Sequence, residues 1–280
     1  MRIAQVVWPD ASEYERKCQR ADFAALSASH EVVVAPIGEV RADVAHVYAG
    51  RELPRGPFVG FAVPYVSSAD VKQARWPLRK AAVPDYVVSP LIEKIEQSRY
   101  QPLPEPVEDA YFDAQRSGGL QPADARLKPG ATLVVASFAR PAVANIIDQT
   151  LARIHRFRED VTWNVYTHVP TPADLAGVDV WVDPAAGESD FDGFVAEALV
   201  VGAAVVATRT KINVLRLEHG RTGLLVPPRD PNELTHAILA ALFKPEVAGA
   251  KSAAARQTNS KFRAKQRLRV LVHMYETIIP

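Results

Sequence analysis

Short apolar runs alternate with segments of helical periodicity over most of this sequence. This alternation constrains the fold strongly, because it is typical of β-α-β units, in which a helix carries the chain from one parallel strand to the next. The pattern is interrupted between Tyr100 and Gly130, where proline, glycine and charged residues dominate and a linker is predicted. The sequence therefore predicts two α/β units with parallel sheets.

The first group of predicted elements precedes the linker. A helix is expected where apolar positions such as Phe23 and Leu26 recur among charged residues. The predicted strands are 2–8, 30–36, 43–49, 58–65 and 85–90, and the predicted helices are 13–29 and 91–98.

The second group follows the linker and repeats the alternation. Strands are predicted from apolar runs that end at proline or polar residues, and helices from longer amphipathic segments. The predicted strands are 131–138, 162–168, 178–184, 203–208 and 222–228, and the predicted helices are 142–157, a segment beginning near 194, and 231–243. The basic tail from Lys251 onward also has a helical pattern.

Composition excludes several classes of partner. Lys and Arg total 33 against 32 for Asp and Glu, so a net charge of +1 supplies no general attraction for nucleic acid or an anionic membrane. The basic tail is expected to be a solvated helix face. The single cysteine, Cys18, fits a reducing compartment. No apolar run approaches the roughly 20 residues that span a bilayer, so we expect a cytoplasmic protein without a transmembrane segment.

A candidate site lies after the strand 178–184. Ligands of open parallel sheets bind at the carboxyl ends of the strands, so we expect a cleft there between the two units. The loop AAGESDFDG precedes a helix whose amino end favours an anion such as phosphate. Glu197, in the first helical turn, either accepts hydrogen bonds from sugar hydroxyls or faces water and only complements the helix dipole.

Other chemistries lack their motifs. The histidines are isolated from one another and from Cys18, so no metal site is predicted. Neither a Walker phosphate loop nor a Rossmann glycine fingerprint is present. The acidic segment GESDFDG lacks the spacing of a calcium loop. We therefore expect neither a metal nor a cofactor.

Two longer segments carry a family resemblance. SDFDGFVAEALVVGAAVVAT and EHGRTGLLVPPRDPNELTHAI resemble the carboxyl-terminal domain of retaining glycosyltransferases of the two-domain GT-B fold. This is the large group 1, or family 4, type that includes sucrose and glycogen synthases and many bacterial cell-surface sugar transferases. The resemblance covers residues 130–244 well and is weaker before them.

The resemblance implies a domain organisation and an activity. Two doubly wound, Rossmann-like domains would face each other across a cleft. Residues 1–105 would form an acceptor-side domain, 106–129 a linker and 130–255 the domain that binds the nucleotide sugar. The tail, 256–280, is similar to the last helix of the family, which packs back on the first domain. The implied reaction transfers a sugar from a nucleotide-diphosphate sugar to a hydroxyl of a glycan, lipid-linked sugar or small molecule, with retention of configuration.

The resemblance also implies a donor site. Glu197 matches the acidic residue that binds the ribose of the nucleotide in the family. The acid eight positions upstream would fall on Ser189, with Glu188 adjacent, and one of these would touch the donor sugar. The backbone around Phe191, with Asp192 where the family has glycine, would meet the diphosphate. Gly193 and Phe194 complete this loop.

The residues implied to bind the diphosphate differ from those of the family. Ser137 and Ala142 stand where the family has arginine and lysine. Arg140, in the same loop, either replaces one of these charges or is an ordinary surface cation. Lys211 and Arg209, after a later strand, are further candidates.

No catalytic residue is assigned in the first unit. Val63, Pro64 and Tyr65 stand where the family has a histidine near the reacting sugar. His46 matches another histidine of the family, and we expect it to be buried and structural. These substitutions point to an alternative to the transferase, a non-catalytic binding or scaffold protein of the same fold. A further alternative, a nucleotide-sugar epimerase of the same fold, would need acid/base pairs in the cleft that the sequence does not place.

Overall fold

A computed structural model of the chain describes two compact units. The first comprises Met1–Glu108 and Lys261–Pro280, and the second comprises Asp109–Ser260. The described residues are 1–7, 11, 13–35, 40–49, 58–66, 87–89, 100–102, 105–114, 132–186, 193–244 and 262–278.

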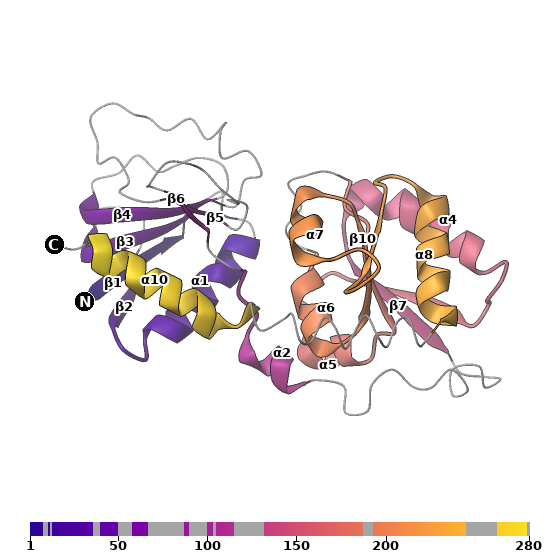
Figure 1. The fold of residues 1–280 in the computed structure, drawn as a ribbon, viewed down its shortest axis with the longest axis horizontal. Coiled ribbons are helices and arrows are strands. Elements are labelled where there is room, and N and C mark those ends of the chain that lie inside the picture. The colour runs from indigo at the N-terminus through magenta and orange to yellow at the C-terminus, as the bar shows by residue number, and fades with distance from the viewer. Residues whose placement is uncertain are drawn as a thin grey trace. The chain divides into compact units, whose positions relative to one another are not determined.

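The first unit is built on a six-stranded parallel sheet in the order β2-β1-β3-β4-β5-β6. Helices α1 (Glu13–Leu26) and α10 (Ala264–Ile278) pack against each other beside it (Figure 1). The strands are β1 (Arg2–Val7), β2 (Glu31–Ala35), β3 (Val40–Ala49), β4 (Phe58–Val66), β5 (Val87–Ser89) and β6 (Tyr100–Pro102).

A buried polar network ties α10 to this unit. Arg267 donates to both carboxylate oxygens of Asp22, from Nε at 2.6 Å and from Nη2 at 2.7 Å. Both side chains are almost fully buried, and the hydroxyl of Tyr48 also donates to Asp22, at 2.8 Å. Because an isolated buried charge is very unfavourable, this pair explains how a charged residue can lie inside the unit.

His46 belongs to the same network, and its predicted structural character is confirmed. Its ring is fully buried, stacks on Tyr48 and shares a hydrogen bond through Nδ1 with the hydroxyl of Tyr275. Burial, followed by the positive charge of Arg267, lowers the pKa of His46 well below its usual value. The imidazole is therefore neutral in the folded protein at neutral pH.

The second unit is built on a five-stranded parallel sheet in the order β11-β10-β9-β7-β8. Its strands are β7 (Leu133–Phe138), β8 (Val161–Tyr166), β9 (Val180–Asp183), β10 (Ala204–Thr208) and β11 (Leu224–Val226). Its helices are α2 (Asp109–Asp113), the 3-10 turn η1 (Pro141–Val143), α4 (Ala144–Ile154), α5 (Pro172–Ala176), α6 (Val195–Val201), α7 (Lys211–Arg216) and α8 (Pro231–Phe243).

Two helix layers cover this sheet. Helices α4 and α8 lie side by side and pack with the strands around a core that includes Val135, Val180 and Ile238 (Figure 1). Helix α6 contacts β9, β10, α5 and α7. Since the side chains of a strand alternate between its faces, the alternate residues of β9 are left for the opposite side of the sheet.

The expected alternation is confirmed at every predicted strand. The predicted helix 231–243 is also found, as α8. Helices α2, α5 and α7 and strand β6 were not predicted, because each is only three to six residues long and leaves little periodicity to detect. The predicted helix 91–98 and most of the predicted linker lie outside the described residues.

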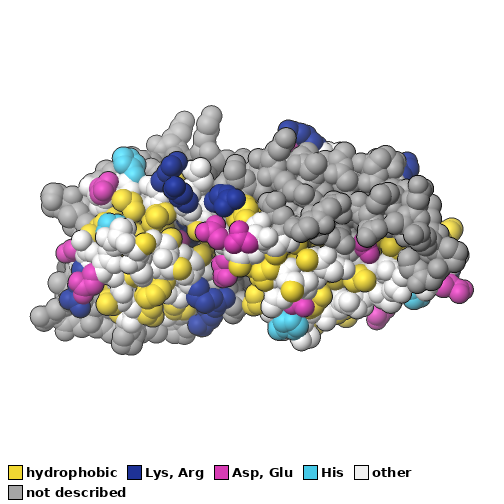
Figure 2. Space-filling model, turned by 90° about the horizontal axis from the view of Figure 1, so that it is seen from below, with side chains coloured by type: hydrophobic (Ala, Val, Ile, Leu, Met, Phe, Trp, Pro, Cys, Tyr) yellow, Lys and Arg dark blue, Asp and Glu magenta, His cyan; other side chains and the backbone are white. Residues whose placement is uncertain are grey.

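The expectation of a solvated basic face on the tail is wrong for one residue. Arg263, Lys265 and Arg269 are exposed, whereas Arg267 is buried against Asp22. On the face drawn in Figure 2, basic and acidic side chains lie among one another, in keeping with the near-zero net charge. None of the helices in the described part is both long and apolar enough to cross a membrane.

Candidate functional site

The strand order of the second unit identifies one edge of its sheet. In the order β8-β7-β9-β10-β11, the chain moves to one side from β7 to β8 and then to the other side from β9 onward. The point between β7 and β9 is therefore a topological switch point. Open parallel sheets bind ligands outside the carboxyl ends of the strands at such a point. Arg140 follows β7 here, and Asp183 ends β9.

Asp183 projects from the sheet on the side of α6. Val180 and Val182 belong to the core beneath α4 and α8, so Trp181 and Asp183 point the other way. The indole Nε1 of Trp181 donates to the carbonyl of Gly193 at 2.7 Å, just before α6. The carboxylate of Asp183 is itself 1% exposed.

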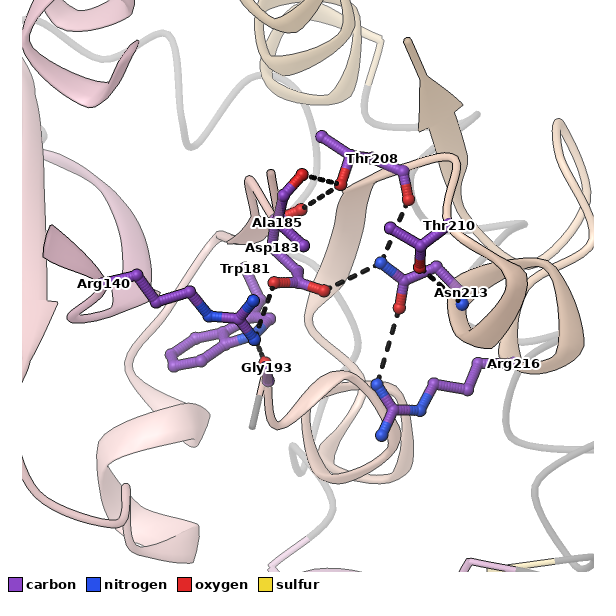
Figure 3. Close-up of polar contacts among 9 residues, drawn as sticks. All are labelled: Arg140, Trp181, Asp183, Ala185, Gly193, Thr208, Thr210, Asn213 and Arg216. Carbon is purple, nitrogen blue, oxygen red and sulfur yellow. Dashed lines mark hydrogen bonds and ion pairs between the residues drawn. The ribbon is translucent and has the colours of Figure 1, made fainter. Parts of the chain in front are cut away.

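Arg140 meets this carboxylate at the switch point (Figure 3). Its Nη2 lies 3.3 Å from Oδ1 of Asp183, and its side chain is only 11% exposed. The alternative of an ordinary surface cation is therefore wrong. The two terminal nitrogens of its guanidinium, Nη1 and Nη2, are buried, and so is the carboxylate of Asp183.

Asn213 holds the other side of the same carboxylate. Its Nδ2 donates to Oδ2 of Asp183 at 2.8 Å and to the carbonyl of Thr208 at 3.0 Å. Asn213 is placed by the start of α7, where its backbone amide donates to the N-cap hydroxyl of Thr210 at 3.2 Å. Arg216 donates to Oδ1 of Asn213 at 3.5 Å (Figure 3). We call Arg140, Asp183, Asn213 and Arg216 the Asp183 cluster.

The residues that lead into α6 are constrained around this cluster. A Cβ at Gly193 would lie 2.6 Å from Cγ of Asp183, so only glycine leaves the carboxylate its present place. Phe194 adopts a left-handed backbone conformation with φ 48°, which is strained for a bulky residue. Its ring packs edge-on against Phe138, at 5.0 Å between centroids, and this contact helps to hold it.

Glu197 does not face water. It lies in the first turn of α6 and is 1% exposed, and every other residue of this helix is buried as well. The alternative in which Glu197 only complements the helix dipole from the solvent is therefore wrong. A carboxylate at this depth requires polar partners, so its burial is informative. Its contact with a ribose stays a prediction.

The structure describes some of the other predicted donor-site residues and not others. The hydroxyl of Ser137 is buried and accepts a hydrogen bond from Nε1 of Trp163 at 3.0 Å, on the face opposite Phe138. Arg209 is exposed. Lys211 begins α7, and nothing is described of its side chain. Glu188, Ser189, Phe191 and Asp192 lie outside the described residues.

Sequence reasoning missed Asp183, Asn213 and Arg216. A signal for Asp183 existed, because it is the only charged residue of the strand VWVD and ends it at the ligand-binding edge. Asn213 and Arg216 leave no such signal, since the helix that carries them has only six residues.

The residues that the structure describes do not form a recognisable metal-binding site. Within them, no group of three or more His, Cys, Asp and Glu side chains could hold a metal ion. The charges that gather at the switch point belong instead to two guanidinium groups and a carboxylate. Guanidinium groups are the side-chain groups that most often bind phosphate and carboxylate in a bidentate way.

The second unit contains a segment that matches a known protein family. Residues 123–243 match the family described as "Glycosyl transferases group 1". No curated protein matches the sequence. The matched segment contains every member of the Asp183 cluster.

Solved structures of other proteins resemble this chain over nearly its whole length. A glycosyltransferase from Rickettsia africae aligns with a TM-score of 0.68 and 13% identity, over 99% of this chain and 98% of the other. Anabaena Alr3699/HepE in complex with UDP-glucose aligns with a TM-score of 0.69 and 12% identity, over 99% and 100%. Sucrose-phosphate synthase from Thermosynechococcus elongatus aligns with a TM-score of 0.62 and 14% identity, over 99% of each chain. At these identities the likeness shows the fold, which is of the GT-B type.

Proposed function

Because the chain is a group 1 glycosyltransferase of the GT-B fold, we propose that it transfers a sugar from a nucleotide-diphosphate sugar to an acceptor hydroxyl. The observation that carries this proposal is the place of Arg140. It lies at the switch point of the second sheet, inside the segment that matches the family, where its guanidinium pairs with Asp183.

The chemistry of the transfer explains what Arg140 would do. The bond between the anomeric carbon and the diphosphate oxygen breaks, and the electron pair leaves with the diphosphate. A new bond forms between that carbon and the acceptor oxygen, whose proton is released. Negative charge therefore grows on the diphosphate in the transition state, where a fixed cation stabilises it more than in the ground state.

Further details of the reaction belong to the proposal. We propose that configuration is retained, on the strength of the family resemblance in residues 130–244. We also propose that Glu197 accepts hydrogen bonds from the ribose, which its buried place at the start of α6 supports. Arg140 and backbone amides would stabilise the leaving group without a metal, so EDTA is expected to leave the rate unchanged.

Two structural neighbours support the class of donor. Anabaena Alr3699/HepE was solved in complex with UDP-glucose, and a TarM mutant was solved with UDP and α-GlcNAc-glycerol. We propose a donor of the same chemical class, a nucleoside diphosphate joined to a hexose, for this chain.

The test is a donor panel with matched arginine variants. The protein is incubated with UDP-, GDP-, ADP-, TDP- and CDP-hexoses, and release of the nucleoside diphosphate is measured. Arg140→Met is expected to lower kcat about 100-fold, the usual cost of one group that stabilises transition-state charge. Arg221→Met is the control. Arg221 is exposed, pairs with Glu218 and precedes β11, so it lies at the amino end of a strand and the switch point lies at the carboxyl ends.

Two further readouts sharpen the test. Glu197→Gln keeps the shape of the side chain and is expected to raise KM for the donor more than it lowers kcat. Proton NMR of the product reports the anomeric configuration. Absence of release with every donor, or equal rates for Arg140→Met and wild type, would contradict the proposal.

A further inference from the structure

Folding gives helix α1 a basic outer side that its composition does not suggest. The helix carries equal numbers of basic and acidic residues, namely Arg16, Lys17 and Arg20 against Glu13, Glu15 and Asp22. Glu15 and Asp22 are buried, whereas Arg16 and Arg20 lie one turn apart and are exposed. The acids whose side chains the structure describes on this helix therefore lie inside the unit, and two arginines lie outside.

The buried charges of the unit compensate one another. Asp22 accepts hydrogen bonds from Arg267 of α10, and Nζ of Lys17 lies 3.3 Å from a carboxylate oxygen of Glu105. Because burying an unpaired charge is very unfavourable, each buried acid of these pairs is matched by a buried base. The outside of the helices keeps the basic residues that have no part in these pairs.

Helix α10 has the same arrangement as α1. Lys265 and Arg269 lie on either side of the buried Arg267 in the sequence, and both are exposed. Glu276, near the end of α10, is the single exposed acid among the side chains that the structure describes on the two helices.

A second exposed acid lies near the start of α10. Glu108 follows Val107, whose backbone pairs with Arg263 just before the helix. The exposed acids therefore lie toward the two ends of α10, and Lys265 and Arg269 lie between them along the chain.

Both helices cover the same face of the first sheet (Figure 1). Gln19 of α1 donates to Gln5 of β1 at 2.7 Å, and Tyr275 of α10 contacts His46 of β3. Gln5 and His46 are partners on neighbouring parallel strands, so their side chains point to the same face. The exposed sides of α1 and α10 therefore both point away from the sheet. We call the following residues the α1–α10 basic surface: Arg16, Arg20, Lys265 and Arg269.

The chemistry of this surface favours a lipid bilayer over a protein or a nucleic acid. The large apolar side chains that are exposed in the described part of the chain all lie outside α1 and α10, and protein interfaces depend on such anchors. Among their described side chains, neither helix has an exposed phenylalanine, tyrosine or tryptophan on which a base could stack. Positive charge spread over two helices attracts an anionic leaflet without a matched pocket.

We propose that the α1–α10 basic surface binds the anionic phospholipid headgroups of a membrane. This inference does not rest on the proposed donor site, because all four residues belong to the first unit. Screening limits the attraction to roughly 10 Å in about 0.1 M salt, so this surface attracts a bilayer although the whole chain has a net charge of only +1. A lipid-linked sugar, one of the acceptor classes that the family resemblance implies, is presented at such a bilayer.

The test is co-sedimentation of the full-length protein with vesicles. Vesicles of phosphatidylcholine with about one third phosphatidylglycerol are compared with vesicles of phosphatidylcholine alone. We expect binding to the anionic vesicles only. This binding should be lost as salt rises from about 0.1 M to about 1 M, because the Debye length falls from about 10 Å to about 3 Å.

Two pairs of substitutions test the surface independently. Each Lys or Arg near an anionic leaflet strengthens binding about fivefold, so removing two should weaken it about 25-fold. Lys265→Gln with Arg269→Gln is the first pair, and Arg16→Gln with Arg20→Gln is the second. Glutamine is a good helix former, and circular dichroism and Tm report folding, so one pair keeps the test open if the other destabilises its helix.

A matched control removes the same charge from the second unit. Arg156 and Arg221 are both exposed there, and Arg156→Gln with Arg221→Gln should change binding to anionic vesicles by less than about twofold. Release of nucleoside diphosphate in the absence of vesicles is measured for every variant. We expect it to be unchanged, so a failure of this inference leaves the proposed function standing.

The outcomes decide between a membrane and other partners. Salt-sensitive binding to anionic vesicles that both basic pairs weaken, and the control does not, supports the inference. Equal binding to both kinds of vesicle, no binding to either, or binding that Lys265→Gln with Arg269→Gln leaves unchanged overturns it. Binding of a duplex RNA that is as tight as that of anionic vesicles, and is weakened by the same pair, would show a general polyanion surface and overturn the assignment to a membrane.

Discussion

Replacing Arg267 with methionine should destabilise the first unit strongly. The substitution keeps most of the aliphatic stem but removes the two hydrogen bonds, of 2.6 Å and 2.7 Å, that Asp22 accepts from Arg267. Asp22 then remains as a buried charge with the hydroxyl of Tyr48, at 2.8 Å, as a donor.

The magnitude follows from the burial of the pair. Removing one partner of a buried ion pair costs about 3–5 kcal/mol, and the remaining donation from Tyr48 places this case near the lower end. For a unit of this size, 1 kcal/mol corresponds to about 3–4 °C in Tm. We therefore expect a loss of about 3 kcal/mol and a fall in Tm of about 10 °C.

The assay is urea unfolding followed by circular dichroism, together with calorimetry. Arg269→Met is the matched control, because Arg269 lies on the same helix and is exposed, and it should change the free energy of unfolding by less than about 0.5 kcal/mol. The double variant with Asp22→Asn should recover part of the loss, since no buried charge remains. A loss below about 1 kcal/mol in Arg267→Met would refute this account of the pair.

Three further predictions concern stability. The pKa of His46 lies well below 6.5 in the folded protein, so its contribution to the free energy of unfolding is complete above about pH 6.5. As the pH falls further, the free energy of unfolding decreases by about 1.4 kcal/mol per pH unit. His46→Gln should remove that part of the slope in urea titrations between about pH 6.5 and 5.5. Asp230→Ala removes the N-cap of α8, which accepts from the amides of Asn232 and Glu233, and should lower the free energy of unfolding of the second unit by about 1 kcal/mol, measured by urea denaturation. Gly223→Ala places a Cβ 2.7 Å from Leu217 and 3.0 Å from the carbonyl of Val205, and should lower the calorimetric Tm through overpacking that costs about 1–3 kcal/mol; an unchanged Tm would mean that Leu217 gives way freely.

Much of the fold could be predicted because its signals are local. Each buried strand is a short apolar run, and α8 combines a capping aspartate, an initial proline and an apolar face within one segment. Helix α5 shows the limit of this approach. It has a complete capping box between Thr171 and Asp174, yet its five residues are too few for a periodic pattern.

The candidate site depends on contacts that the local sequence does not encode. Arg140 and Glu197 could be named because they lie in segments with a family resemblance. The partners of Asp183 could not, because Arg140 and Asn213 lie 43 and 30 residues away along the chain and meet it only through the strand order. Arg267 was misplaced for the same reason, since its partner is 245 residues distant.

Calorimetric titration of the wild-type protein and Arg140→Met with UDP, GDP, ADP, TDP and CDP tests the central claim most directly. The account predicts that wild type binds one of these nucleotides with a micromolar Kd, that Arg140→Met weakens this binding at least tenfold, and that Arg221→Met leaves it unchanged. Binding that is equally tight in wild type and Arg140→Met, or no binding of any nucleotide by wild type, would contradict a donor site at the switch point of the second sheet.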